Sequence, residues 1–101
     1  MILEIATLDI RKSAIEDFEA AFEDAKQVIA QSPGFVGLEL YHCVETATKY
    51  QVLIEWESLE DHTVTFRNSD LFDEWREIIS PYFQNAPHVE HFVWKSGSDD
   101  N

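Results

Sequence analysis

The sequence has few basic residues and a single cysteine. Seven lysines and arginines stand against twenty aspartates and glutamates, so the 101 residues carry a formal net charge of -13. A surface of this charge repels nucleic-acid phosphates and anionic lipids, and we expect neither nucleic acid nor membrane as a partner. Cys43 has no second cysteine in the chain, which excludes an intrachain disulfide and agrees with a reducing, cytoplasmic location.

Long apolar runs are also missing. No run approaches 18 residues, so the sequence predicts no membrane-spanning helix, and the first ten residues lack the basic segment of a signal peptide. Hydrophobic residues still make up 45% of the chain and aromatic residues 13%, which is enough for a packed core. The length fits one domain, predicted at residues 1–95, followed by a disordered polar tail at residues 96–101.

The first part of the chain predicts a strand followed by a helix. Residues 1–10 are rich in isoleucine and leucine with polar interruptions, as in a strand. Ser13 predicts the helix start, because Glu16 follows three residues later and completes a capping box. Apolar residues then recur at helical spacing as far as Ile29, and the Ser-Pro-Gly sequence at 32–34 ends the helix.

The second part of the chain predicts three more strands and two helical segments. Ser58 predicts the start of a short helix, Ser69 caps a further helix, and Pro81 ends or kinks it. The three strands are predicted at residues 35–44, 49–57 and 88–95. A hairpin turn joins the first two of them.

This order of elements predicts an α+β fold with the ferredoxin-like split βαβ topology. Right-handed crossovers place the first helix and the later pair of helical segments on one face of a four-stranded antiparallel sheet. The other face is not cleanly polar, and burying it against a second copy of the chain would stabilise the fold. We therefore expect a two-fold homodimer; the alternative is a monomer with a partly solvated sheet face.

The alternation of side chains assigns residues to the two faces of the sheet. In the third predicted strand Leu53 lies on the face opposite to the apolar set Tyr50, Val52, Ile54 and Trp56. In the second strand, Val36 and Leu38 are predicted to face one way and Phe35 the other.

Three stretches of the sequence resemble the antibiotic biosynthesis monooxygenase family. They are the Ser-Pro-Gly-Phe sequence at 32–35 with the strand after it, residues 50–58, and the spaced residues His62, Phe66, Ser69, Phe72 and Trp75. The resemblance covers residues 2–94 and implies a dimeric α/β barrel with a pocket between sheet and helices. It implies no single reaction, because the family contains cofactor-free quinol and anthrone oxygenases, haem-degrading enzymes, an isomerase of a sugar phosphate, and members without known activity.

The haem-degrading branch of this family is a poor match. It places an asparagine on the first strand, a tryptophan at the end of the third and a histidine ligand on the last helix. Trp56 matches the tryptophan, but Ala6 or Thr7 stands near the asparagine position and Arg76 in the turn of the histidine. An arginine cannot ligate haem iron, so we expect no haem and no other cofactor.

A cofactor-free oxygenase needs an apolar pocket, a base and a donor for the developing oxyanion. His62 is the predicted base, because it shares an apolar helix face with Leu59 and Phe66 and imidazole titrates near neutral pH. The alternative for His62 is a buried structural histidine, and for the aromatic residues simple core packing. The predicted pocket residues are Trp56, Phe66, Trp75, Arg76, Tyr82 and His42.

Two further features bear on the chemistry. Arg67 and Arg76 could hold an anionic group, or else pair with neighbouring acidic residues on the surface. His88 and His91 point to opposite faces of a strand, so we predict no metal site. The sequence thus favours a cofactor-independent monooxygenase of a small phenolic, quinol or polyketide-like aromatic substrate. The alternatives are a non-catalytic dimer that binds a small ligand or regulates a partner, and an isomerase using the same pocket.

Overall fold

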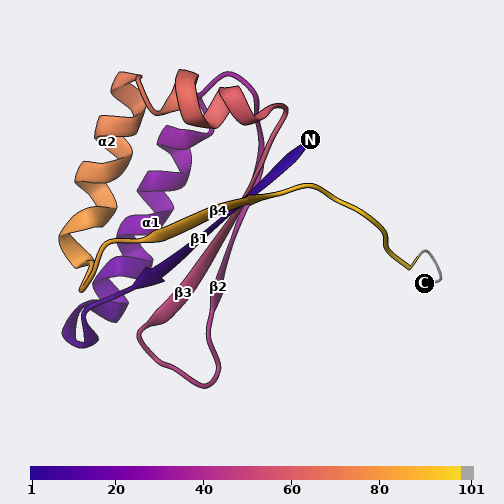
Figure 1. The fold of residues 1–101 in the computed structure, drawn as a ribbon. Helices are drawn as coiled ribbons and strands as arrows, with labels where there is room; N and C mark the ends of the chain where they lie inside the picture. Colours follow the sequence, from indigo (N-terminus) through magenta and orange to yellow (C-terminus); the bar gives the residue numbers. More distant parts are fainter. Residues whose placement is uncertain (99–101) are drawn as a thin grey trace.

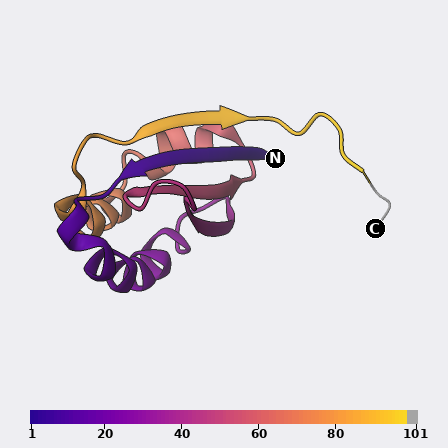
Figure 2. The same cartoon turned by 90° about the horizontal axis from the view of Figure 1, so that it is seen from below.

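Four antiparallel strands form one sheet in the order β2-β3-β1-β4, and helices α1 and α2 lie together on one side of it (Figures 1 and 2). This confirms the predicted ferredoxin-like α+β fold. The computed structural model describes residues 1–98, so residues 99–101 of the predicted tail lie outside the description. The elements are β1 (Ile2–Asp9), α1 (Ile15–Ile29), β2 (Phe35–His42), β3 (Lys49–Trp56), η2 (Asp61–Phe66), α2 (Asp70–Ile79) and β4 (His88–Phe92).

The core lies between the sheet and the helices. Every second residue of β3 faces the helices, from Tyr50 to Trp56, and each of these side chains is at most 1% exposed. From α1, Phe18 packs edge-on against Tyr50 with ring centroids 5.0 Å apart, and Phe22 packs against Trp75 of α2. The predicted apolar face of β3 is therefore confirmed as the inner face of the sheet.

Strand β2 differs from the prediction at its start. The pairing of β2 with β3 shifts register between Phe35 and Gly37, which marks a β-bulge. The extra residue turns Phe35 to the helix-covered face, where its ring contacts Trp56 at a centroid distance of 5.9 Å, and leaves Val36 exposed. The prediction that Phe35 and Leu38 face opposite ways is therefore wrong, because strict alternation does not hold across a bulge.

The helix starts follow the sequence at two of three places. Ser69 accepts the backbone N–H of Phe72, and Ser58 exchanges hydrogen bonds with Asp61, so both predicted caps are confirmed. The predicted cap at Ser13 is wrong, because a 3-10 turn occupies residues 12–14 and α1 begins without a side-chain cap. Within residues 1–98 no helix has the length and apolar character needed to cross a membrane.

Gly34 forms the turn that leads into β2. Its φ of +82° is in the left-handed region, and its carbonyl accepts the N–H of Glu57 at 2.8 Å. A Cβ at this position would lie 2.1 Å from the carboxyl carbon of Asp61. The turn therefore packs directly against the start of η2, the short helix after β3, which has π-helical geometry.

The other face of the sheet carries apolar residues that the helices do not cover. Leu3 of β1 lies opposite Phe92 of β4, and Ile5 of β1 opposite Leu53 of β3. Leu3, Ile5 and Leu53 are partly exposed, and Phe92 is 44% exposed. This face is the one that the sequence predicts to pair with a second copy.

Candidate active site

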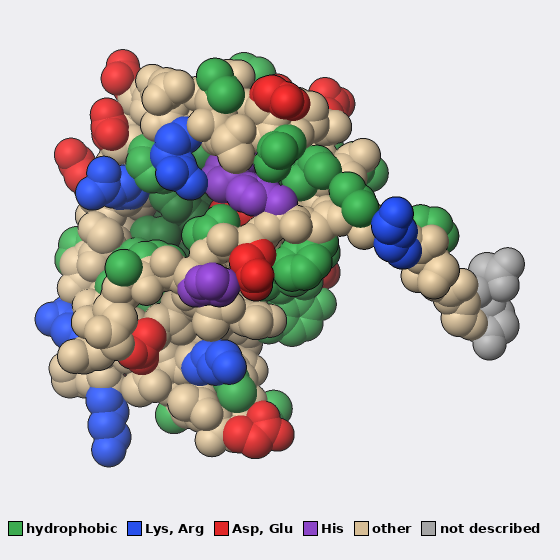
Figure 3. All heavy atoms as spheres, viewed as in Figure 1, with side chains coloured by type: hydrophobic (Ala, Val, Ile, Leu, Met, Phe, Trp, Pro, Cys, Tyr) green, Lys and Arg blue, Asp and Glu red, His purple; other side chains and the backbone are tan. Residues whose placement is uncertain are grey.

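A cavity of about 340 Å³ lies between the inner face of the sheet and the helical segments η2 and α2. In the space-filling view a hollow with hydrophobic side chains opens beside histidines and basic side chains (Figure 3). The volume suits a small aromatic molecule. The apolar lining comes from alternate residues of β1 and β3, from the helices, and from β4 and the segment before it. The polar lining consists of Glu4, His62, Arg67, Arg76 and Ser80.

Glu4 is a buried carboxyl group in the cavity wall. It lies on β1 in the inward-pointing series with Ala6 and Leu8 and is only 5% exposed. Its Oε1 accepts a hydrogen bond of 2.9 Å from the indole Nε1 of Trp56. Burial raises the pKa of Glu4 to about 7, although the Trp56 bond and the positive charge of Arg67 oppose the shift. Near neutral pH this carboxyl can therefore both accept and release a proton.

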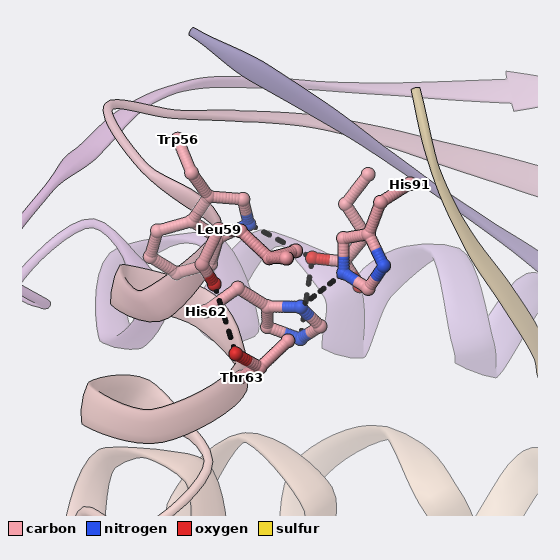
Figure 4. Close-up of polar contacts among 6 residues, drawn as sticks. Trp56, Leu59, His62, Thr63 and His91 are labelled. Carbon is pink, nitrogen blue, oxygen red and sulfur yellow. Dashed lines mark hydrogen bonds and ion pairs between the residues drawn. The ribbon is translucent and has the colours of Figure 1, made fainter. Parts of the chain in front are cut away.

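His62 lies between Glu4 and a second histidine, His91. Figure 4 shows the His62 ring between those of Trp56 and His91. His62 is 3% exposed, its Nε2 lies 3.4 Å from Glu4 Oε1, and its Nδ1 lies 2.8 Å from Nε2 of His91 on β4. The ring stacks on Trp56 with centroids 5.4 Å apart. Burial lowers the pKa of His62 to about 4, and His91 and Arg67 lower it further in the same direction. His62 is therefore a neutral imidazole at pH 7, and both of its nitrogens face a polar partner.

His91 is the outer member of this chain of polar groups. Its pKa is also lowered, first by burial and then by the charge of Arg67. Its side chain is only partly buried, so it lies between the enclosed Glu4 and solvent. A continuous line of proton acceptors thus runs from the cavity wall outward, through Glu4, His62 and His91.

Two arginines flank one aromatic ring at the cavity. The guanidinium carbon of Arg67 lies 5.4 Å from the ring centroid of Phe72, and that of Arg76 lies 5.6 Å from it. Within residues 1–98 neither arginine forms an ion pair with a carboxylate, so the alternative of pairing with neighbouring acidic residues is not what the structure shows.

The structure brings together most of the predicted site residues. His62, Phe66, Trp75 and Arg76 line the cavity. Trp56 lies behind them, with its ring against His62 and its N–H on Glu4.

Besides Trp56, two further predicted pocket residues lie outside this lining. Tyr82 packs against Phe18 at a centroid distance of 6.4 Å. His42 stacks on Tyr50 at 4.1 Å, with its Nε2 2.7 Å from the carbonyl oxygen of Ala47.

The strand β4 places its two histidines on different faces, as the sequence predicts. His88 lies opposite Thr7 and its Nε2 is 3.3 Å from Glu90, whereas His91 lies opposite Glu4 on the inner face. Among residues 1–98 there is no group of three or more histidine, cysteine, aspartate and glutamate side chains arranged to hold a metal ion.

Glu4 and His91 are site residues that the sequence pattern did not indicate. Glu4 could have been found, because it is an acidic residue in the same alternating series as Ala6, Leu8 and Ile10. An acidic side chain at an inward position of a strand is costly unless something pairs with it, which makes it a candidate functional group. His91 carries no comparable signal, because its role depends on a neighbour 29 residues away in the sequence.

Comparison with known proteins gives consistent results. A model of the family described as antibiotic biosynthesis monooxygenase matches residues 1–78. The chain is 39% identical over 92 residues to the uncharacterized protein YczJ of Bacillus subtilis (strain 168), covering 91% of this chain and 97% of that protein.

Solved structures share the fold. A protein of Bordetella bronchiseptica, provisionally named as an antibiotic biosynthesis monooxygenase, superposes with a TM-score of 0.91 at 30% identity, covering 94% of this chain and 97% of that one. SnoaB, a cofactor-independent oxygenase of Streptomyces nogalater, superposes with a TM-score of 0.81 at 13% identity, covering 98% of this chain and 97% of that one. The second likeness concerns the fold only.

Proposed function

This chain belongs to the antibiotic biosynthesis monooxygenase family, and we propose that it is a cofactor-independent monooxygenase of a small phenolic, quinol or polyketide-like aromatic substrate. The observation that carries the proposal is the buried carboxyl of Glu4 in an apolar cavity, with a pKa of about 7. The pKa of an efficient general base lies near the working pH. The name of SnoaB, a cofactor-independent oxygenase of the same fold, supports the same class of reaction.

The proposed reaction begins with proton transfer to Glu4. The ionised carboxylate accepts a proton from an acidic C–H or O–H group of the substrate, and the resulting carbanion adds to molecular oxygen as a peroxide. The peroxide anion takes up one proton, equal in number to the one that the substrate gave to Glu4, and loss of water from the resulting hydroperoxide leaves a new carbonyl group. One oxygen atom enters the product and the other leaves as water, so the substrate supplies all four electrons and no other reductant is required.

His62 has a different place in this proposal from the one its sequence position predicts. As a neutral imidazole between Glu4 and His91, it can take the proton from Glu4 on Nε2 while its Nδ1 proton passes to His91. The base in direct contact with substrate is then Glu4, and His62 returns it to the ionised state. Trp56 holds the carboxyl in place through its N–H.

We further propose that the chain acts as the predicted homodimer. The partly exposed apolar residues Leu3, Ile5, Leu53 and Phe92 lie together on the uncovered face of the sheet. Covering them with the same face of a second copy buries apolar area from both chains, at roughly 25 cal/mol per Å². The cytoplasmic location, inferred from the lone Cys43, stays a prediction.

Oxygen uptake tests the proposed function. A panel of hydroquinones, naphthols and anthrones is offered to the purified protein, and products made under ¹⁸O₂ are analysed by mass spectrometry. We expect one labelled oxygen atom per product, and a loss of about 100-fold or more in rate for Glu4→Gln. The matched control is Glu16→Gln, which removes the same charge from an exposed position on α1.

Other results would point to other functions. Turnover under strict anaerobiosis would replace the monooxygenase with an isomerase that uses the same carboxyl and imidazole groups. Tight binding of panel members without any turnover, in protein shown to be folded, would favour a non-catalytic ligand-binding role. A Glu4→Gln variant with unchanged oxygen uptake would remove Glu4 from the mechanism.

A further inference from the structure

Arg67 and Arg76 form an unusual pair in so acidic a chain. The chain has three arginines among twenty acidic residues, and two of the three line the same cavity. Within residues 1–98 neither forms an ion pair, although Asp70, Asp73 and Glu77 are near them in sequence. In this part of the chain neither guanidinium lies within ion-pair distance of a carboxylate, although the charge of Arg67 lowers the pKa of Glu4, so the two cations leave a local positive field at the cavity of a chain whose net charge is -13.

The ring of Phe72 orients these guanidinium groups. Both guanidinium carbons lie within 5.6 Å of its centroid, and the ring packs edge-on against Phe66, which lines the cavity. A guanidinium held against an aromatic face loses little more conformational freedom when it binds a planar anion. A carboxylate accepts two parallel hydrogen bonds from such a group.

The polar groups of the cavity lie at different depths. Arg67 and Arg76 are exposed, whereas Glu4 and His62 are buried, at 5% and 3% exposed. The rest of the cavity lining is mainly apolar and aromatic, with Phe66, Trp75 and Ile79 among its residues. A ligand with an anionic end and an aromatic body would therefore place the anion at the mouth and the ring inside, next to Glu4.

We propose that Arg67 and Arg76 bind a carboxylate group of the substrate, so that the preferred substrates are aromatic carboxylic acids whose reacting ring extends toward Glu4. This inference rests on the proposed function for its statement about substrates. The anion site itself stands on the two arginines, the Phe72 ring and the cavity between them and Glu4. A carboxylate at the mouth also prevents the substrate from entering in the reverse orientation, because the anion would then meet the Glu4 carboxyl in a low-dielectric environment.

Calorimetric titration of two matched probes tests the anion site without any turnover. The probes are 2-naphthoate and 2-naphthamide, which share the same ring system and differ in charge. We expect the wild-type protein to bind 2-naphthoate about 10- to 100-fold more tightly than 2-naphthamide. Arg67→Gln and Arg76→Gln should each weaken 2-naphthoate binding by about tenfold and leave 2-naphthamide binding unchanged.

The third arginine supplies the control. Arg11→Gln removes one positive charge at a position outside the cavity lining. The affinity of this variant for 2-naphthoate should therefore equal that of the wild type. Unchanged 2-naphthamide binding shows that the cavity of each variant is still folded. Equal affinity of the wild type for the two probes would overturn the proposal, as would an equal loss of 2-naphthoate binding in Arg11→Gln.

The two proposals fail in different ways. Charge-dependent binding of 2-naphthoate without oxygen uptake on any hydroxylated aromatic acid would leave the anion site standing and remove the monooxygenase. Oxygen uptake with neutral quinols, together with equal binding of the two probes, would support the monooxygenase and remove the anion site.

Discussion

The indole Nε1 of Trp56 donates a hydrogen bond of 2.9 Å to the Oε1 of Glu4, and both residues are buried. Trp56 at the end of β3 lies opposite Ile2, so Glu4 is its diagonal neighbour on the same face of β1. The residue that best matches the family pattern thus makes its one hydrogen bond to the carboxyl group proposed as the base. This bond lowers the pKa of Glu4, against the larger effect of burial.

Removing the indole donor should move the pH dependence of the reaction. In Trp56→Phe the carboxylate of Glu4 loses a hydrogen bond, so its pKa should rise above the wild-type value of about 7, by on the order of one pH unit. Because the ionised form of Glu4 is the proposed base, the acid limb of the rate profile should shift to higher pH by the same amount. The measurement is the rate against pH, with ¹³C NMR of the labelled carboxyl as a direct reading.

Trp75→Phe is the matched control for this prediction. It removes an indole from the wall of the same cavity, but not the bond to Glu4. We expect its acid limb to stay at the wild-type position. A shift of equal size in both variants would mean that cavity shape, and not the Trp56 bond, sets the pH dependence.

Glu4 should also make stability depend on pH. Its pKa is about 7 in the folded protein against 4.5 as the ordinary value, so the folded state binds more protons between these limits. Its contribution to stability is therefore fully present below pH 4.5 and is lost as the pH rises through 7. Glu4→Gln has no such loss, so its stability relative to the wild type should rise across this range, by at most about 3 kcal/mol.

Urea unfolding of both proteins between pH 4.5 and pH 8.5 measures this difference. His62 has a lowered pKa of about 4, and its own contribution is lost as the pH falls below 6.5. To first order that loss is the same in both proteins and cancels in the comparison. A flat difference between Glu4→Gln and the wild type across this range would contradict the raised pKa of Glu4.

The proposed dimer predicts that one substitution on the sheet face that the helices leave uncovered changes the oligomeric state. Leu53→Lys places a charge at a partly buried position in the middle of the sheet face that the helices leave uncovered. We expect sedimentation at micromolar concentration to show a dimer for the wild type and a folded monomer for this variant. Val64→Lys is the control, because Val64 is 52% exposed on η2, away from that face, and the variant should remain a dimer.

Hydrophobic periodicity, of two residues in the strands and of three to four residues in the helices, was enough to predict the sheet and the helical segments. It worked for β3 because the burial of Tyr50, Val52, Ile54 and Trp56 follows the two-residue repeat without interruption. It did not work for Phe35, since a bulge adds one residue to the strand and no residue type announces it. Ser13 failed as a cap because the chain forms a 3-10 turn there before α1 begins.

The candidate site was harder to predict than the fold. His62 and Trp75 could be assigned to an inward face from helical spacing, but spacing does not say which groups they meet. The line from Glu4 through His62 to His91 joins β1, η2 and β4, so it exists only when the strand register is known. His42 was a reasonable candidate by residue type, yet the strand carries it to Tyr50, outside the cavity lining.

Of the glycines in the chain, Gly34 in the Ser-Pro-Gly turn should be the one whose replacement costs the most stability. Gly34→Ala forces an alanine into a φ of +82° and places its Cβ against Asp61, the residue that exchanges hydrogen bonds with Ser58 at the start of η2. We expect a loss of about 2–4 kcal/mol in the free energy of unfolding, measured in urea. Weaker probe binding should accompany it, because η2 carries His62 and Phe66 into the cavity wall.

Gly37→Ala provides the comparison three residues later. The nearest atom to a Cβ at Gly37 is an oxygen of Glu55 at 3.8 Å, an ordinary contact, and its φ is outside the left-handed region. Its stability should therefore stay within about 0.5 kcal/mol of the wild type. If both variants were equally stable, Asp61 would have to move freely away from the turn. The packing of Gly34 against η2 would then not be what holds His62 in place.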